Sequence, residues 1–177
     1  HETEMLAIVL DRGFQSIFPE AVEDEARVLK KAEARTLLEE AKYRRDFRNI
    51  PTFTVDPIDA KDFDDALSFR AGGDGNYEVG IHIADVSHYV RPGTTLDDEA
   101  KKRATSIYLV DRTIPMLPEI LSNDLCSLNP DEDKLTFSVI TTLSPTGEIL
   151  KTDFDKTIIR SVKRFTYEEG QAVLDAK

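Results

Sequence analysis

An acidic decapeptide at residues 56–65 constrains the fold of this chain more than any other segment. It reads DPIDAKDFDD, with five aspartates and one lysine, and so carries a formal charge of −4. Carboxylates this close raise one another's pKa and destabilise a folded chain unless water surrounds them or cations neutralise them. The segment is therefore expected to be either a solvated loop or a cation site.

The residues around the decapeptide place it between two strands. Phe53 and Val55 alternate with threonines, and Pro57 disfavours a helical conformation at Asp56, which predicts a strand that ends at Asp56. Residues 66–71 have the pattern of the next short strand. Acids that close one strand and open the next favour a built site over a loose loop.

Four interpretations of these acids compete. A calcium loop of the EF-hand type is excluded, because the D-x-D-x-D-G series is absent. An aspartyl-nucleophile phosphotransferase fits poorly, since Pro57 and Lys61 stand where a buried strand should lead into Asp62-Phe63-Asp64. A solvated acidic turn and a two-metal phosphoryl-transfer site both stay open. The second needs no protein nucleophile, and the chain has neither a G-x-S-x-G elbow nor a P-loop.

The remaining pattern predicts an α+β fold with a mixed, mostly antiparallel sheet and flanking helices. Helical spacing covers 19–48, and two hairpins are expected, one turning at 72–76 and the other joining 135–143 to 149–159. Ile107 to Val110 is β-prone. Shorter helices are expected after a cap at Thr94 or Thr95 and after a capping box formed by Thr166 and Glu169.

Composition narrows the class of protein. The 177 residues carry a net charge of −11, which argues against a broad electrostatic hold on nucleic acid. No apolar run approaches the roughly 18 residues of a membrane span, so no membrane partner is expected. Cys126 is the single cysteine, which excludes an internal disulfide framework and fits a cytoplasmic location. We expect it to be buried.

Three segments resemble the RNase II/RNB family, and in particular its bacterial exoribonuclease R members. They are DPIDAKDFDDAL at 56–67, GIHIADVSHYV at 80–90 and IPMLPEILSNDLCSLNPDEDKLTFSV at 114–139. The resemblance covers nearly the whole chain. Residues 1–50 are similar to the helical connector before the catalytic domain, and 51–177 to the N-terminal half of that domain, cut at its C-terminal side.

The resemblance implies a processive 3′→5′ exoribonuclease that uses one or two Mg²⁺ ions to hydrolyse single-stranded RNA to nucleoside 5′-monophosphates. The family's metal-binding carboxylates correspond to Asp56, Asp62, Asp64 and Asp65, with Asp64 the least replaceable for turnover. Tyr108 corresponds to an aromatic residue that stacks on the base at the RNA 3′ end. Asp59 falls at a position that the family does not use as a ligand.

The same resemblance implies that important parts lie outside this chain. The remaining half of the catalytic domain and OB-type RNA-binding domains are expected in a longer parent protein, and the fragment alone is expected to bind RNA weakly and to degrade it negligibly. The alternative is a non-catalytic RNA-binding or regulatory relative with a solvated acidic loop. His82 is expected to be a hydrogen-bonded structural residue.

Overall fold

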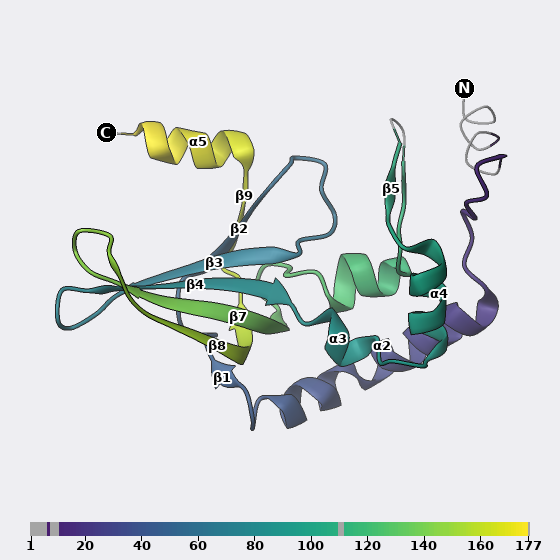
Figure 1. Ribbon diagram of the computed structural model, residues 1–177, viewed down its shortest axis with the longest axis horizontal. Helices are drawn as coiled ribbons and strands as arrows, with labels where there is room; N and C mark the ends of the chain where they lie inside the picture. Colours follow the sequence, from purple (N-terminus) through teal and green to yellow (C-terminus); the bar gives the residue numbers. More distant parts are fainter. Residues whose placement is uncertain (1–6, 8–10, 110–111, 177) are drawn as a thin grey trace.

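The computed structural model describes residues 7, 11–109 and 112–176. A sheet forms one end of the molecule and most of the helices form the other (Figure 1). The helices are α2 (Glu20–Glu40), α3 (Val86–Tyr89), α4 (Thr95–Arg103), the π-helix η1 (Leu121–Leu125) and α5 (Tyr167–Asp175).

Seven strands build the main sheet, in the order β1-β8-β7-β4-β3-β2-β9. Four of its six strand pairs are antiparallel, and only β1 with β8 and β2 with β9 are parallel, which confirms the predicted fold class. A separate hairpin consists of β5 and β6. The bounds are β1 (Arg45–Asp46), β2 (Thr52–Asp56), β3 (Asp65–Ala71), β4 (Tyr77–Ala84), β5 (Ile107–Tyr108), β6 (Thr113–Ile114), β7 (Asp133–Leu143), β8 (Ile149–Arg160) and β9 (Lys163–Thr166).

Helix α2 is shorter than predicted. Helical spacing continues to residue 48, but α2 ends at Glu40, and Arg45–Asp46 form β1 beside β8. Two buried side chains explain the difference. Arg44 turns inward to pair with Asp85, and the ring of Phe47 packs 5.1 Å from that of His82. These tertiary contacts outweigh the local helix propensity of the segment.

Both predicted hairpins and both predicted caps are confirmed. Residues 72–76 join β3 to β4, with Gly75 at a positive φ of 84°, and residues 144–148 join β7 to β8. The Thr94 hydroxyl accepts from the Asp97 amide at the start of α4, and Thr166 and Glu169 form the capping box of α5. The predicted strand at Ile107 to Val110 forms over its first two residues, and Val110 lies outside the described part.

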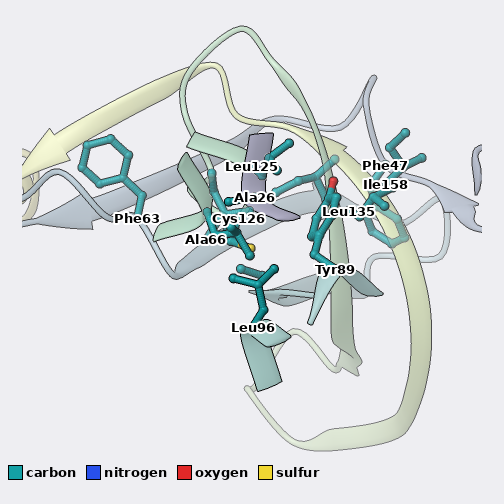
Figure 2. Close-up of a cluster of buried hydrophobic side chains, with 14 of the residues drawn as sticks. Ala26, Phe47, Phe63, Ala66, Tyr89, Leu96, Leu125, Cys126, Leu135 and Ile158 are labelled. Carbon is teal, nitrogen blue, oxygen red and sulfur yellow. The ribbon is translucent and has the colours of Figure 1, made fainter. Parts of the chain in front are cut away.

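The core lies between the inner face of the sheet and the helices. Figure 2 shows Ala26 of α2, Leu125 of η1, Cys126 and Leu135 of β7 gathered there, with Phe63 of the acidic loop to one side. Cys126 is buried, as expected. Because Phe63 is part of this core, the middle of the acidic loop is attached to the body of the protein rather than standing in solvent.

His82 lies within the sheet and is fully buried. Its Nδ1 is 2.6 Å from the Ser138 Oγ and its Nε2 is 2.8 Å from the Ser68 Oγ, so both ring nitrogens are hydrogen-bonded. This arrangement confirms a structural rather than a ligand role. Burial lowers the pKa of His82 to about 4, because a charged imidazole loses its hydration there.

His82 is expected to make the fold sensitive to acid. Its stabilising contribution is complete above its ordinary pKa of 6.5 and falls as the pH drops to about 4, because only the unfolded chain then gains the proton. The loss over this range is about 3 kcal/mol. Urea unfolding at pH 7 and pH 4.5 measures it, with His82→Gln as the control that lacks the titrating ring. An equally steep loss in the variant would contradict the assignment.

The outer face of the sheet is apolar and exposed. Strand register places large side chains of β3, β4, β7 and β8 together on this face. Contiguous apolar surface of this kind commonly marks a contact with another protein segment. The side chains include Leu67, Phe69, Ile81, Ile83, Phe137 and Phe154.

Within the described ranges, no helix has the length and apolar character needed to cross a bilayer.

Candidate metal and RNA site

One open pocket of about 670 Å³ contains all the predicted site residues. The end of β2 and the loop before β3 supply its acids, and the β5 hairpin supplies Tyr108. In Figure 1 this loop and the hairpin project from the same side of the molecule. Asp56 and Tyr108, which are 52 positions apart in sequence, thus line one space. The predicted residues that line it are Asp56, Asp62, Asp64, Asp65 and Tyr108.

Asp56 is the buried acid of the group. It ends β2, is 8% exposed, and its Oδ2 has no hydrogen-bond partner within the described structure. Burial raises its pKa and the charges of Asp65 and Asp62 raise it further, whereas the nearby Thr54 hydroxyl and the charge of Arg164 act in the opposite direction. A buried carboxylate oxygen without a partner is costly unless a cation or a donor arrives.

Asp64 lies at the surface but is surrounded by the other acids. Its pKa is raised, mainly by partial burial and to a smaller extent by the charges of Asp62, Asp65 and Asp56. The Asp64 main chain is fixed, because its carbonyl accepts a 2.9 Å hydrogen bond from the Ala84 amide at the end of β4. The site therefore holds mutually repelling carboxylates on a rigid backbone.

The donor set suits a hard divalent cation. Mg²⁺ prefers oxygen ligands and is commonly held by one or two carboxylates together with water and substrate phosphate. A positive charge at this point would give the Asp56 Oδ2 a partner and would offset the repulsion among the aspartate carboxylates. In the described part of the chain, however, no three His, Cys, Asp or Glu side chains are already arranged as a metal cage. The half-buried Asp62 and the exposed Asp64 and Asp65 would have to change rotamer to close around an ion.

Tyr108 presents its ring to solvent rather than to the core. It is 71% exposed, which excludes the role of a core-filling strand aromatic. Partial burial raises the pKa of its hydroxyl, and the charges of Asp62 and Asp64 add to the shift. An exposed aromatic ring beside the acids is suited to stacking on a flat ligand.

The sequence did not point to two arginines at this site. Arg112 of the β5–β6 turn lines the pocket, and its carbonyl accepts from the Leu109 amide. Arg164 donates to the Pro57 carbonyl and lies 5.2 Å from the ring centroid of Phe63. Its place follows from the parallel pairing of β9 with β2, which sets Arg164 opposite Thr54. The only sequence signal for this strand was the alternation of side-chain types in 163–166, which is four residues long and too short to predict the strand.

We expect the crowded acids to cost stability when no metal is present. Because the pKa of Asp64 is raised, the folded state is penalised at pH 7 and relieved as the pH falls through that raised value. Asp64→Asn should therefore stabilise the chain by about 0.5–1 kcal/mol at pH 7 in EDTA, a Tm increase of about 1–4 °C. Calorimetry at pH 7 and pH 3.5 measures this, and the gain should shrink at the lower pH. A lower Tm for the variant at pH 7 would show that Asp64 stabilises the fold.

Comparison with known proteins places the chain in a family. The model of the RNB domain matches residues 44–177, which include the acidic loop, Tyr108 and the whole main sheet. The chain belongs to the RNB domain family. The match begins at residue 44, in the segment between α2 and β1. It therefore includes the last residues of the segment 1–50 that the resemblance assigns to the connector.

Two curated relatives show the range of the family. DIS3-like exonuclease 2 of Schizosaccharomyces pombe is 52% identical over 140 residues, which are 78% of this chain and 15% of that protein. Ribonuclease R of Chlamydia muridarum is 42% identical over 176 residues, or 99% of this chain and 25% of that protein. The chain thus spans about a quarter or less of the length of these relatives.

Two solved structures share the fold. Mycoplasma genitalium RNase R in complex with double-stranded RNA superposes with a TM-score of 0.86 and 34% identity, covering 97% of this chain and 30% of that one. Yeast Ssd1, described as a pseudonuclease, superposes with a TM-score of 0.72 and 27% identity, covering 78% and 17%. The RNB fold therefore occurs both in ribonucleases and in a protein described as a pseudonuclease.

Proposed function

We propose that this chain supplies the metal-binding part of a Mg²⁺-dependent, processive 3′→5′ exoribonuclease that hydrolyses single-stranded RNA to nucleoside 5′-monophosphates. The observation that carries the proposal is the pocket, in which five aspartates, the four expected ligands and Asp59, lie beside one exposed aromatic ring. Membership of the RNB family and similarity to RNase R support RNA as the substrate.

Asp56, Asp62, Asp64 and Asp65 would hold one or two Mg²⁺ ions. The chemistry that bound Mg²⁺ would supply is activation of a water and stabilisation of the leaving oxygen of the phosphodiester. The acids themselves repel RNA phosphate, so they admit it only after a cation has been bound. Tyr108 would stack on the base at the 3′ end, a contact worth about 1–3 kcal/mol per base that tolerates any sequence.

The parent protein would supply the partners that this chain lacks. In this proposal, residues 1–50 are a connector and 51–177 are the first half of the catalytic domain. The second half would cover the exposed apolar face of the sheet, and OB-type domains would supply most of the RNA-binding affinity.

The net charge of −11 fits a chain that binds RNA weakly by itself. The lone Cys126 fits a cytoplasmic location.

Metal removal and product analysis test the proposed reaction. A full-length protein that carries this sequence should release nucleoside 5′-monophosphates from the 3′ end of a 5′-labelled single-stranded RNA in Mg²⁺, and none in EDTA. Denaturing gels and thin-layer chromatography separate the products. The 177-residue chain under the same conditions should release essentially none. Internal cleavage, or full turnover in EDTA, would contradict the proposal.

A non-catalytic RNA-binding relative is the second candidate. Two observations favour it, namely the acids that are not arranged as a metal cage and the similarity to a protein described as a pseudonuclease. The two candidates differ in Mg²⁺ binding. Calorimetric titration of the 177-residue chain with Mg²⁺ should give a saturable signal that Asp64→Asn removes if the exoribonuclease proposal is correct. The absence of any signal would favour the second candidate.

A further inference from the structure

We propose that Ser127 is a positioning residue that fixes the acidic loop, so that Asp62 and Asp64 remain directed at the pocket. Ser127 follows η1, 64 residues away from Phe63 in sequence, and its side chain is fully buried. Its contacts are with the loop backbone and with Asn129, not with a carboxylate. The proposal rests on the proposed function, in which these acids hold Mg²⁺.

Two neighbouring residues secure both polar groups of the Phe63 backbone. The Phe63 amide donates to the Ser127 Oγ over 3.0 Å, and the Phe63 carbonyl accepts from the Leu128 amide over 2.8 Å. Phe63 stands directly between Asp62 and Asp64, so these hydrogen bonds define the direction in which the two carboxylates leave the chain. The buried Phe63 ring adds packing to the same point.

The Ser127 hydroxyl is itself oriented. It lies 3.1 Å from the Asn129 Oδ1, with the Lys61 carbonyl at 3.5 Å, and Asn129 in turn donates to the Asn123 carbonyl. The hydroxyl proton points to one of these acceptors, which leaves an oxygen lone pair for the Phe63 amide. Ser127 is thus one member of a connected network rather than an isolated contact.

The segment that carries Ser127 is anchored to the core. The Cys126 amide closes the π-helical turn on the Leu121 carbonyl, and the buried Lys134 donates to the Asp124 carbonyl over 2.6 Å. Lys134 also pairs with Glu132 at 2.8 Å. Single π-turns are uncommon and frequently occur at functional sites. This rigid support lets Ser127 hold the loop without touching an ion.

Ser127→Ala should weaken Mg²⁺ binding by about 10–100-fold, as is typical when a residue behind the metal ligands is lost. Isothermal titration of the 177-residue chain with MgCl₂ measures the affinity. Ser122→Ala is the matched control, because Ser122 lies on the same segment but its hydroxyl contacts Pro118 and Asn123. The control should bind Mg²⁺ within twofold of the original chain.

Amide hydrogen exchange supplies a readout that does not depend on metal. In Ser127→Ala, the Phe63 amide should exchange at least tenfold faster, while the amides of β7 and β8 stay protected. If the alanine variant does not fold, Ser127→Cys keeps the size of the side chain with a weaker acceptor, and should show a smaller loss of both affinity and protection.

The outcomes separate this proposal from the proposed function. Unchanged protection at Phe63, or unchanged Mg²⁺ affinity in a folded Ser127 variant when the original chain binds Mg²⁺, overturns the positioning role. Absence of Mg²⁺ binding by the original chain counts against the proposed function, and the exchange measurement then still decides whether Ser127 holds the loop.

Discussion

In a full-length protein that carries this sequence, Asp64→Asn should reduce RNA hydrolysis by at least about 10²–10³-fold while RNA binding changes little. Asparagine keeps the shape of the side chain but removes a charge from the most crowded point of the acidic pocket, where Asp62, Asp65 and Asp56 all act on Asp64. The proposed Mg²⁺ site would lose a ligand there. RNA would keep its contacts, since the proposed function assigns them to Tyr108 and to parts outside this chain.

The measurement is a single-turnover time course on 5′-labelled single-stranded RNA, together with a filter-binding affinity in EDTA. Asp59→Asn is the matched control, since Asp59 lies on the same loop, is exposed, and falls at a position that the resemblance does not assign as a ligand. The control should retain at least half of the original rate. Equal losses in the two variants would mean that the loop acts only through its total charge.

Local pattern predicted much of this fold and most of the pocket. The charge density of 56–65, the proline after Asp56 and the turn glycines are properties of neighbouring residues, and the structure places them as expected. Resemblance then added Tyr108 and the choice of four acids among five. The pocket brings all of these residues together.

The features that the sequence did not predict depend on distant partners. Arg44 meets Asp85 across 41 residues, Ser127 meets Phe63 across 64, and Arg164 meets Pro57 across 107. No periodicity or capping signal connects such positions, because each contact arises only after the strands have paired. The same reason explains why α2 is shorter than its sequence pattern predicts, since Arg44 and Phe47 leave helical spacing to reach partners in the sheet.

Arg44→Met should destabilise the fold by about 3–5 kcal/mol, because it leaves Asp85 as a buried charge without its main partner. The Arg44 side chain is 1% exposed and that of Asp85 is 3% exposed, with 2.7 Å between Nη2 and Oδ2. Arg44 also donates to Glu40 at the end of α2 and to the Thr136 carbonyl in β7, so it ties the helix to the sheet.

Chemical unfolding at pH 7 measures the loss. Arg27→Met is the control, because Arg27 pairs with Asp24 at the surface, where such a pair contributes less than about 1 kcal/mol. The double variant Arg44→Met/Asp85→Asn removes the stranded charge and should recover part of the stability. A loss no larger in Arg44→Met than in Arg27→Met would mean that water reaches Asp85.

The pH dependence of the Arg44 effect identifies its cause. In the original chain, burial opposes ionisation of Asp85, but the hydrogen bonds from Arg44 and Ser87 prevail and hold its pKa below the ordinary value of 3.8. The stabilisation is thus present above pH 3.8 and is lost only as the pH falls through that lower value. Without Arg44, burial should raise the pKa of Asp85, so the variant regains stability as the pH falls towards 4. The difference between the two proteins should therefore narrow from pH 7 to pH 4, whereas a loss of packing alone would leave it constant.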